Sequence, residues 1–127
     1  VNSAGVAGIH ESLRSGVLTK ALKHLRLVEE SKAVEEILER LGRGRLDVTY
    51  GLAEVEKAKT FGAVEKLLLT DTTLREANDE KRLTLEGIMR EVEEKGGKIM
   101  VLSAENEAGE KLLALGGIAA LLRFPVG

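Results

Sequence analysis

Carboxylates and hydroxyls gather at Asp71-Thr72-Thr73, with Asp79 and Glu80 a few residues further on. This stretch follows an apolar run that we predict to be a buried strand, and α/β proteins often bind ligands beyond the carboxyl end of a strand. A phosphate site would also need a glycine-rich loop, which is missing here. The chain contains no GxSxG, Walker or dinucleotide-binding pattern. We therefore expect no catalytic residues and interpret the stretch as a turn rich in capping side chains.

The sequence contains few residues that could bind a metal or a cofactor. The chain has no Cys, and its two histidines, His10 and His24, form neither an HxxxH nor an HxH pair. A single His on a charged helix is usually a solvated side chain. We therefore expect no metal site, no cofactor and no enzyme activity. The absence of Cys also fits a reducing compartment, so we expect the protein to be cytoplasmic.

Basic residues concentrate in the first third of the chain. The cluster comprises Lys20, Lys23, His24 and Arg26, extended by Arg40, Arg43 and Arg45. Such a run is usually a solvated face, and Glu36 with Arg40 has the i,i+4 spacing of a solvated helical pair. Contact with phosphates or with an acidic partner is the alternative. The net charge of −2 and the 2% of aromatic residues argue against broad nucleic-acid binding.

The composition is that of a single globular domain. The 127 residues are 43% hydrophobic and 31% charged. No apolar run approaches the roughly 20 residues of a membrane span, so we expect no membrane association. The chain begins with Val1, and we expect it to be a fragment in which residues 1–16 are the tail of a preceding domain and residues 17–127 form the domain itself.

Two helices are predicted before the first strand. Ser3 is a suitable N-cap for a short helix to about Ser15, which Gly16 should interrupt. The second covers residues 17–41, but its apolar residues form two faces. One face contains Leu18, Leu22 and Leu25, and the other contains Leu27, Val34, Ile37, Leu38 and Leu41. Such a helix would contact two partners in succession, as a helix linking two domains does.

Strands and helices alternate after this linking helix. We predict strands at 47–50, 63–71, 98–103 and 118–124 and a polar loop at 70–79. We predict helices at 52–60, at about 80–95, and to Leu115 from a cap at either Ser103 or Asn106. This order predicts an α/β fold, a three-layer α/β/α sandwich with a mixed sheet of about four strands, preceded by the long linking helix.

Four segments together resemble the Pelota family. The end, SAENEAGEKLLALGGIAALLRFPV, resembles that family's closing segment, and VTYGLAEVEKAKTFGAVEKLLLTD matches its pattern YG-x-x-EV-x-x-A, then GAV-x-x-LL-x-(S/T)D. SAGVAGIHESLRSGVL resembles the end of the family's central domain, and the long helix resembles its connection to the C-terminal domain. The resemblance covers essentially the whole chain and implies a release-factor-like C-terminal domain from an archaeal Pelota-like protein.

Class-one peptide release factors carry the same C-terminal domain and are the first alternative. They usually insert a minidomain before the strand that precedes the closing motif, and tend to end LRY. This chain has no insertion there and ends LRFP. The Pelota family is therefore favoured.

Kink-turn-binding ribosomal proteins, relatives of this fold, are the second alternative. Their Gly-x-Asn-Glu segment reads sheared G·A pairs through its amide and carboxylate. The corresponding residues here are Gly51, Leu52, Ala53 and Glu54, so the carboxylate is present but the amide is missing. We therefore expect only weak, salt-sensitive RNA binding.

The resemblance implies ribosome rescue rather than chemistry. Pelota-like proteins recognise stalled ribosomes and promote ribosome dissociation and mRNA surveillance. They act with an elongation-factor-one-alpha-type translational GTPase and an ABC-type recycling ATPase. We therefore expect this chain to be a monomeric protein-interaction domain, with ribosome contact made by the intact protein.

The closing segment is the candidate partner surface. Alternation in the last predicted strand should direct Ile118, Ala120, Leu122 and Phe124 into the core, with Arg123 on the other face. Gly116 and Gly117 either contribute to binding or simply permit a tight turn. The predicted partner-binding residues are Glu107, Glu110, Gly116, Gly117 and Arg123.

Overall fold

A long helix and a four-stranded sheet make up the computed structural model, which describes residues 4–125 and side chains from residue 17 onward. Helix α1 runs without a break over Ala4–Gly42, so the predicted interruption at Gly16 is wrong. A glycine inside a helix costs only about 1 kcal/mol, which is not enough to end it. The predicted cap, Ser3, lies outside the described residues. The chain divides into two compact units, residues 1–30 and residues 31–127.

The sheet in residues 31–127 is mixed, as predicted. Its strands are β1 (Val48–Tyr50), β2 (Val64–Thr70), β3 (Lys98–Leu102) and β4 (Ile118–Leu122). They are arranged in the order β1-β4-β2-β3. β2 and β3 are parallel, whereas β4 is antiparallel to both β1 and β2. The last strand along the chain therefore lies inside the sheet, where both of its faces are covered.

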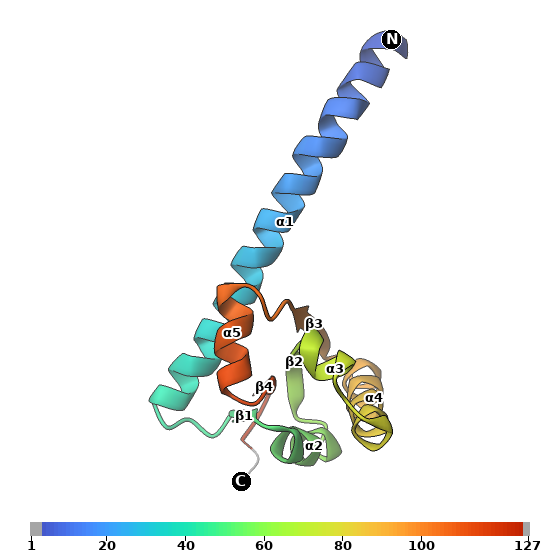
Figure 1. Ribbon diagram of the computed structural model, residues 1–127. Helices are drawn as coiled ribbons and strands as arrows, with labels where there is room; N and C mark the ends of the chain where they lie inside the picture. The colour runs from blue at the N-terminus through green and yellow to red at the C-terminus, as the bar shows by residue number, and fades with distance from the viewer. Residues whose placement is uncertain (1–3, 126–127) are drawn as a thin grey trace. The chain divides into compact units, whose positions relative to one another are not determined.

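Helices cover both faces of this sheet (Figure 1). Helices α2 (Leu52–Thr60) and α4 (Asp79–Glu94) pack on one face, and α5 (Glu107–Ala114) packs with residues 31–42 of α1 on the other. The first core includes Val55, Leu67, Leu69, Ile88 and Leu122, and the second includes Val34, Ile37, Leu68, Leu112 and Leu121. This confirms the predicted three-layer α/β/α sandwich.

Side-chain caps and glycines set the helix boundaries. The side chains of Asn78 and Asn106 accept hydrogen bonds at the starts of α4 and α5. Gly62, Gly96 and Gly116, each with positive φ, follow the C-caps of α2, α4 and α5. Each makes the pair of backbone hydrogen bonds of a Schellman motif together with the residue after it. Each motif leads almost directly into a strand.

Two predicted segments differ from the structure. A short helix, α3 (Asp71–Arg75), occupies part of the predicted polar loop, because the side chain of Thr70 accepts a hydrogen bond from the Thr73 amide. Strand β4 ends at Leu122 rather than at residue 124.

Within residues 4–125, no helix combines the length and the hydropathy needed to cross a membrane.

Candidate partner-binding site

The two closing glycines have different environments. Gly116 is exposed and has φ of +107°, and a Cβ placed on it would meet its nearest neighbour, the Gly51 Cα, at 3.9 Å. Gly117 is buried, and a Cβ there would lie 2.2 Å from the hydroxyl of Thr73. Gly117 is therefore required by packing, whereas Gly116 is accessible to a partner.

A threonine cluster explains why Gly117 must be small. Its carbonyl accepts hydrogen bonds from the Thr70 amide and the Thr73 hydroxyl, both at 3.0 Å. The Thr70 and Thr73 hydroxyls lie 2.7 Å apart, and both residues are buried. The cluster fastens the start of β4 to the end of β2. The resemblance did not distinguish this structural role from a binding role.

Arg123 is exposed, but it forms hydrogen bonds within the domain. Its guanidinium donates a hydrogen bond of 2.8 Å to the Lys95 carbonyl at the end of α4, and its amide bonds to the Ala63 carbonyl. The remaining guanidinium donors are available for a partner. Phe124, which we expected in the core, is 45% exposed. That expectation was wrong because β4 ends two residues earlier, and the alternation of faces ends with it.

Glu107 and Glu110 lie in the first turn of α5 and are exposed. Glu107 pairs with Lys111 at 3.4 Å. A shallow groove of about 60 Å³ runs beside Glu107; its lining comprises Ser31, Val34, Glu35, Glu107, Ala108 and Lys111. Both carboxylates are therefore accessible.

The five predicted residues are spread along the domain rather than gathered in one cluster. The two glutamates lie at the start of α5, the glycines follow its end, and Arg123 lies beyond β4. A five-residue strand spans roughly 17 Å, and all of β4 is buried. Among these residues, the structure leaves Glu107, Glu110, Gly116 and Arg123 accessible to a partner.

A charged cluster that we predicted to be solvated is partly buried. The Arg40 side chain is only 13% exposed and donates to the Asp47 carbonyl at 2.9 Å and to the Leu122 carbonyl at 3.4 Å. It also pairs with Glu36 at 2.5 Å. Arg40 thus ties α1 to the start of β1 and the end of β4. Its i,i+4 spacing to Glu36 gave no indication of this longer-range role.

Asp47 is the acidic centre of this cluster. Its carboxylate accepts two hydrogen bonds from the Arg45 guanidinium, at 3.0 and 2.5 Å. These bonds lower the pKa of Asp47, and the nearby charges of Arg40 and Arg45 act in the same direction.

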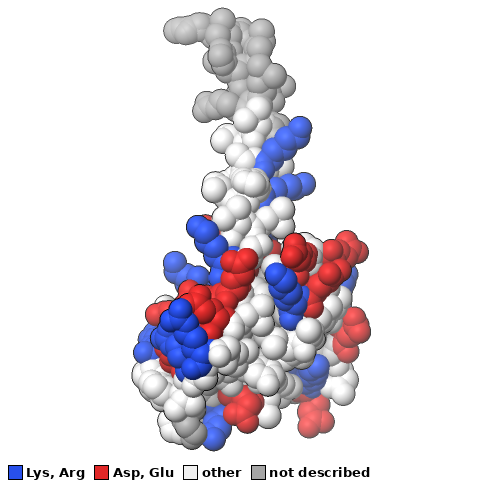
Figure 2. Space-filling model, turned by 90° about the vertical axis from the view of Figure 1, so that its left-hand side faces the viewer, with Lys and Arg blue, Asp and Glu red and all other residues white. Residues whose placement is uncertain are grey.

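Figure 2 shows basic side chains interleaved with acidic ones on the face that it displays. On that face, charges of opposite sign lie close together.

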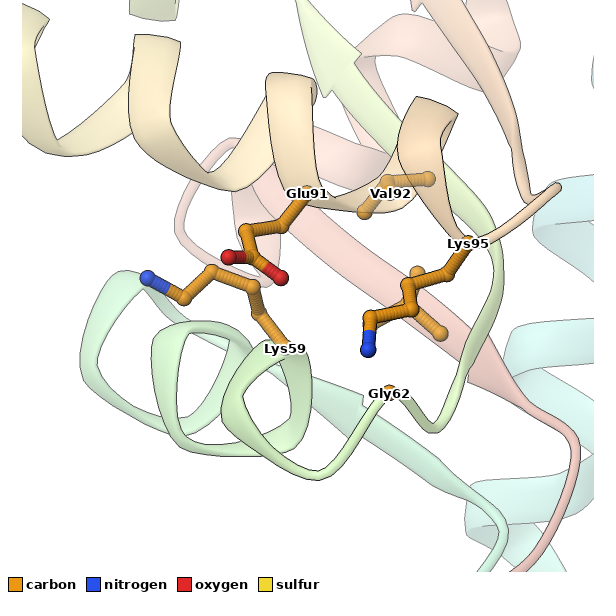
Figure 3. A pocket seen from close by; sticks show the side chains of 6 residues that line it. Lys59, Gly62, Glu91, Val92 and Lys95 are labelled. Carbon is orange, nitrogen blue, oxygen red and sulfur yellow. The ribbon is translucent and has the colours of Figure 1, made fainter.

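A small hollow lies where the ends of α2 and α4 meet (Figure 3). It encloses almost no free volume; its lining comprises Lys59, Gly62, Val64, Glu91, Val92 and Lys95. The Glu91 carboxylate extends toward Lys59, and the Lys95 side chain lies beside Gly62 (Figure 3). None of these six lining residues carries a hydroxyl or thiol that could serve as a nucleophile.

Residues 71–73 were the first candidate for catalysis, but their polar groups form hydrogen bonds within the domain. The Asp71 carboxylate accepts hydrogen bonds from the amides of Thr72 and Ala104, at 2.8 and 3.1 Å. Asp79 and Glu80 are exposed in the first turn of α4. Across the side chains that the structure describes, no three His, Cys, Asp or Glu residues are grouped so as to hold a metal ion.

The candidate segment for kink-turn binding forms the start of α2. Gly51 has φ of +90° and is the N-cap, and Ala53 and Glu54 are exposed in the following turn. The backbone therefore has a glycine-initiated turn. Where the kink-turn-binding proteins have the amide of Asn, this chain has only the methyl side chain of Ala53.

Comparison with known proteins identifies the class to which this domain belongs. Residues 27–126 match the family described as eRF1 domain 3, and the chain belongs to that family.

Within that class, the similarity is to Pelota proteins. The pelota homolog of Archaeoglobus fulgidus is 43% identical over 126 residues, which is 99% of this chain and 36% of that protein. The chain therefore spans about a third of the length of the curated relatives it matches. It superposes on the crystal structure of A. fulgidus Pelota with a TM-score of 0.80, covering 99% of this chain and 39% of that one.

Two further structures bear on partners. Saccharomyces cerevisiae Dom34 is described as a translation termination-like factor in RNA quality control that interacts with Hbs1; it is 36% identical, with a TM-score of 0.78 over 95% of this chain and 34% of that one. An archaeal Pelota bound to the ribosome with ABCE1 is 42% identical, with a TM-score of 0.77 over 100% of this chain and 35% of that one. The archaeal termination factor aRF1 is less similar, at 28% identity and a TM-score of 0.59 over 76% of this chain and 26% of that one.

Proposed function

We propose that this chain is the protein-interaction domain of a Pelota-like ribosome-rescue factor. The observation that supports this most strongly is the 43% identity to an archaeal pelota homolog over nearly the whole chain. The intact protein would recognise stalled ribosomes and promote their dissociation and mRNA surveillance. Residues 1–16 would belong to its preceding domain, and residues 17–127 would form the interaction domain itself.

The local structure supports this assignment over the release-factor alternative. Only residues 95–97 separate α4 from β3, and only residues 103–106 separate β3 from α5. Neither connection has room for the minidomain that release factors usually insert. The domain would therefore use its own helices and exposed strand ends to contact partners.

The partners we propose are an elongation-factor-one-alpha-type translational GTPase and an ABC-type recycling ATPase. The Hbs1 interaction of Dom34 and the presence of ABCE1 beside ribosome-bound Pelota support this choice. The domain would act by binding, as a monomer in the cytoplasm and without catalysis. The commitment of Asp71 to two backbone amides supports the non-catalytic role.

Arg123 is the residue that tests GTPase binding most directly. A guanidinium forms bidentate bonds to carboxylates, and losing such a contact at an interface centre costs about 2 kcal/mol, or about thirtyfold in affinity. The experiment is calorimetric titration of wild type and Arg123→Ala with the cognate GTPase in its GTP-bound form. Because Arg123 is exposed, the variant should melt close to wild type.

Arg90→Ala is the matched control, because Arg90 is also exposed but lies on the outer part of α4. It should bind the GTPase like wild type. Equal affinities for all three proteins would exclude Arg123 as a contact. Failure of even the wild-type chain to bind the GTPase would contradict the proposed partner of this domain.

A further inference from the structure

Two lysines are register partners in the parallel pairing of β2 with β3. Lys66 of β2 lies opposite Lys98 of β3. Lys66 is half-buried and Lys98 is exposed. Paired residues extend from the same face of a sheet, and neighbouring strands lie about 4.8 Å apart, so the two side chains begin side by side. Like charges placed directly opposite one another destabilise a sheet.

No carboxylate compensates this pair within the part of the chain that the structure describes. None lies within ion-pair distance of either lysine, and Glu65, at the register shift between Val64 and Lys66, is exposed and pairs with neither. A lysine on an edge strand can prevent pairing between two copies of a chain. That would explain Lys98, because β3 is an edge strand, but Lys66 lies on β2, inside the sheet. The pair therefore requires another explanation.

The pair lies at one end of a row of register partners that crosses the whole sheet. From β1 through β4 and β2 to β3, the row comprises Val48, Leu121, Lys66 and Lys98. Val48 and Leu121 are buried in the core under α5 and residues 31–42 of α1. Exposure rises from Leu121 to Lys66 and again to Lys98. The helical layer on this face therefore ends before it reaches the lysines.

The same change in exposure occurs along β3. Leu102, at the end of the strand, is buried, Met100 is half-buried, and Lys98, at its start, is exposed. Leu102 and Met100 belong to the core under α1 and α5, so they share the face of the lysines. On that face, the hydrogen bonds of Arg40 hold the end of α1 on the side formed by β1 and β4. Lys66, Lys98 and Met100 thus form an uncovered corner of the sheet, the lysine corner.

The chemistry of the lysine corner fits a carboxylate that lies next to an apolar side chain. Ammonium groups on neighbouring strands can both donate to one carboxylate, and the attraction is stronger beside a half-buried lysine than in open water. Methionine is flexible and adapts to different apolar partners. The corner itself contains no aromatic ring on which a base could stack, which argues against single-stranded nucleic acid.

We propose that the lysine corner binds an acidic helix of a partner protein. A helix would extend the layer that α1 and α5 form on this face. Its carboxylates would neutralise the lysine pair, and an apolar residue one turn away would contact Met100. The corner contains none of the five residues predicted to bind a partner, so its test does not depend on the proposed GTPase.

The test measures binding of the 127-residue chain to a labelled peptide of about fifteen residues in which Glu and Leu recur at helical spacing, by fluorescence anisotropy. Lys66→Gln/Lys98→Gln should weaken binding about tenfold, the loss expected for two ion pairs at a partly buried site. Lys66→Arg/Lys98→Arg keeps both charges and should bind within about twofold of wild type. The matched control, Lys57→Gln/Lys81→Gln, removes two exposed lysines of α2 and α4, on the opposite face, and should bind like wild type.

Thermal melting separates this role from a structural one. Because Lys66→Gln/Lys98→Gln relieves a like-charge contact, its melting temperature should equal or exceed that of wild type. A lower temperature would show that the lysines stabilise the fold, and the premise of an uncompensated pair would be lost.

Three binding results would overturn the proposal. The first is that wild type does not bind the peptide at about 1 mM, or that the Lys57/Lys81 control loses as much affinity as the Lys66/Lys98 variant. The second is that the Lys66/Lys98 variant loses binding to oligouridine but keeps binding to the peptide, because the corner would then bind RNA. The third is a wild-type dimer that the same variant abolishes, because a second copy of the chain would then occupy the corner.

Discussion

At the scale of single residues, a glycine that we predicted to bind a partner is explained here by packing. The carbonyl of Gly117 is held by Thr70 and Thr73, and a side chain would overlap the Thr73 hydroxyl. Gly116, its neighbour, has open space around it. The two glycines therefore provide a matched pair for separating conformational strain from steric overlap.

Gly117→Ala should destabilise the domain by about 2–5 kcal/mol, of which about 1–2 reflects the left-handed backbone and the rest overpacking. Gly116→Ala should lose only the backbone part, about 1–2 kcal/mol. The methyl group added at Gly116 would lie 3.9 Å from its nearest neighbour, which is ordinary van der Waals contact. Urea unfolding of both variants measures the difference. Equal losses would show that the contact with Thr73 relaxes without penalty.

The second residue-scale prediction concerns Asp47. Its pKa is lowered in the folded state, first by the hydrogen bonds from Arg45, so the folded form binds a proton less readily than the unfolded form. The stabilisation is therefore complete above the unfolded pKa of about 4 and is lost as the pH falls through the lower folded pKa. Wild type should exceed Asp47→Asn in unfolding free energy at about pH 6, and the difference should shrink below about pH 4.

Urea unfolding at several pH values provides this comparison. Glu39→Gln is the control, because Glu39 pairs with Arg43 on an exposed surface where both side chains are more than half solvated. Its effect should be small at every pH, as for other exposed pairs. A difference between wild type and Asp47→Asn that does not change with pH would contradict the assigned role of the carboxylate.

At the scale of elements, the sequence was informative where local signals and tertiary contacts agree. Helix α2 occupies residues 52–60 as predicted, because Gly51 and Gly62 delimit a segment whose apolar spacing is helical. Continuous apolar residues likewise located β2 within a sheet covered on both faces. These boundaries depend on nearby residues, so they can be predicted from the sequence alone.

Several of the failures depend on contacts between residues far apart in the chain. Helix α3 is capped locally by Thr70, but the Thr73 hydroxyl that holds it in place reaches Gly117. Arg40 gains its role from carbonyls in β4 and before β1. The Lys66–Lys98 pairing arises only when β2 and β3 are in register. None of these pairings leaves a periodic signal in the sequence.

The end of β4 gives a prediction at the element scale. Leu122 is 3% exposed and Phe124 is 45% exposed. Leu122→Ala should therefore lose about 2–5 kcal/mol, as buried leucines do, whereas Phe124→Ala should change stability by only about 0.5 kcal/mol. Thermal melts of the two variants compare a core position with a surface one. Unfolding by Phe124→Ala would mean that its ring is part of the core.

At the scale of the whole molecule, the continuous helix α1 extends through two compact units. Its apolar residues fall into two groups that behave differently. Ala33, Val34 and Ile37 are buried in the unit formed by residues 31–127. Leu18, Leu22 and Leu25, which share one face, are 51%, 63% and 56% exposed. Of the second predicted face, Val34 and Ile37 contribute to this core, whereas Leu27 and Leu38 are 47% and 38% exposed. The two-face pattern therefore predicted the buried group only in part.

A chain shortened to begin at Ser31 should therefore fold on its own. It retains the three buried residues of α1 and loses a segment in which Leu18, Leu22 and Leu25 are exposed and Glu30 is the one buried side chain among those that the structure describes, so its melting temperature should stay within a few degrees of the full chain. A chain beginning at Leu38 is the control. It lacks Val34 and Ile37, each of which contributes about 1.5–3 kcal/mol by burial, and it should be strongly destabilised. Calorimetric melts of the three chains measure this directly. If the chain beginning at Ser31 unfolds like the one beginning at Leu38, residues 1–30 are part of the cooperative fold, and the independence of the unit formed by residues 31–127 must be abandoned.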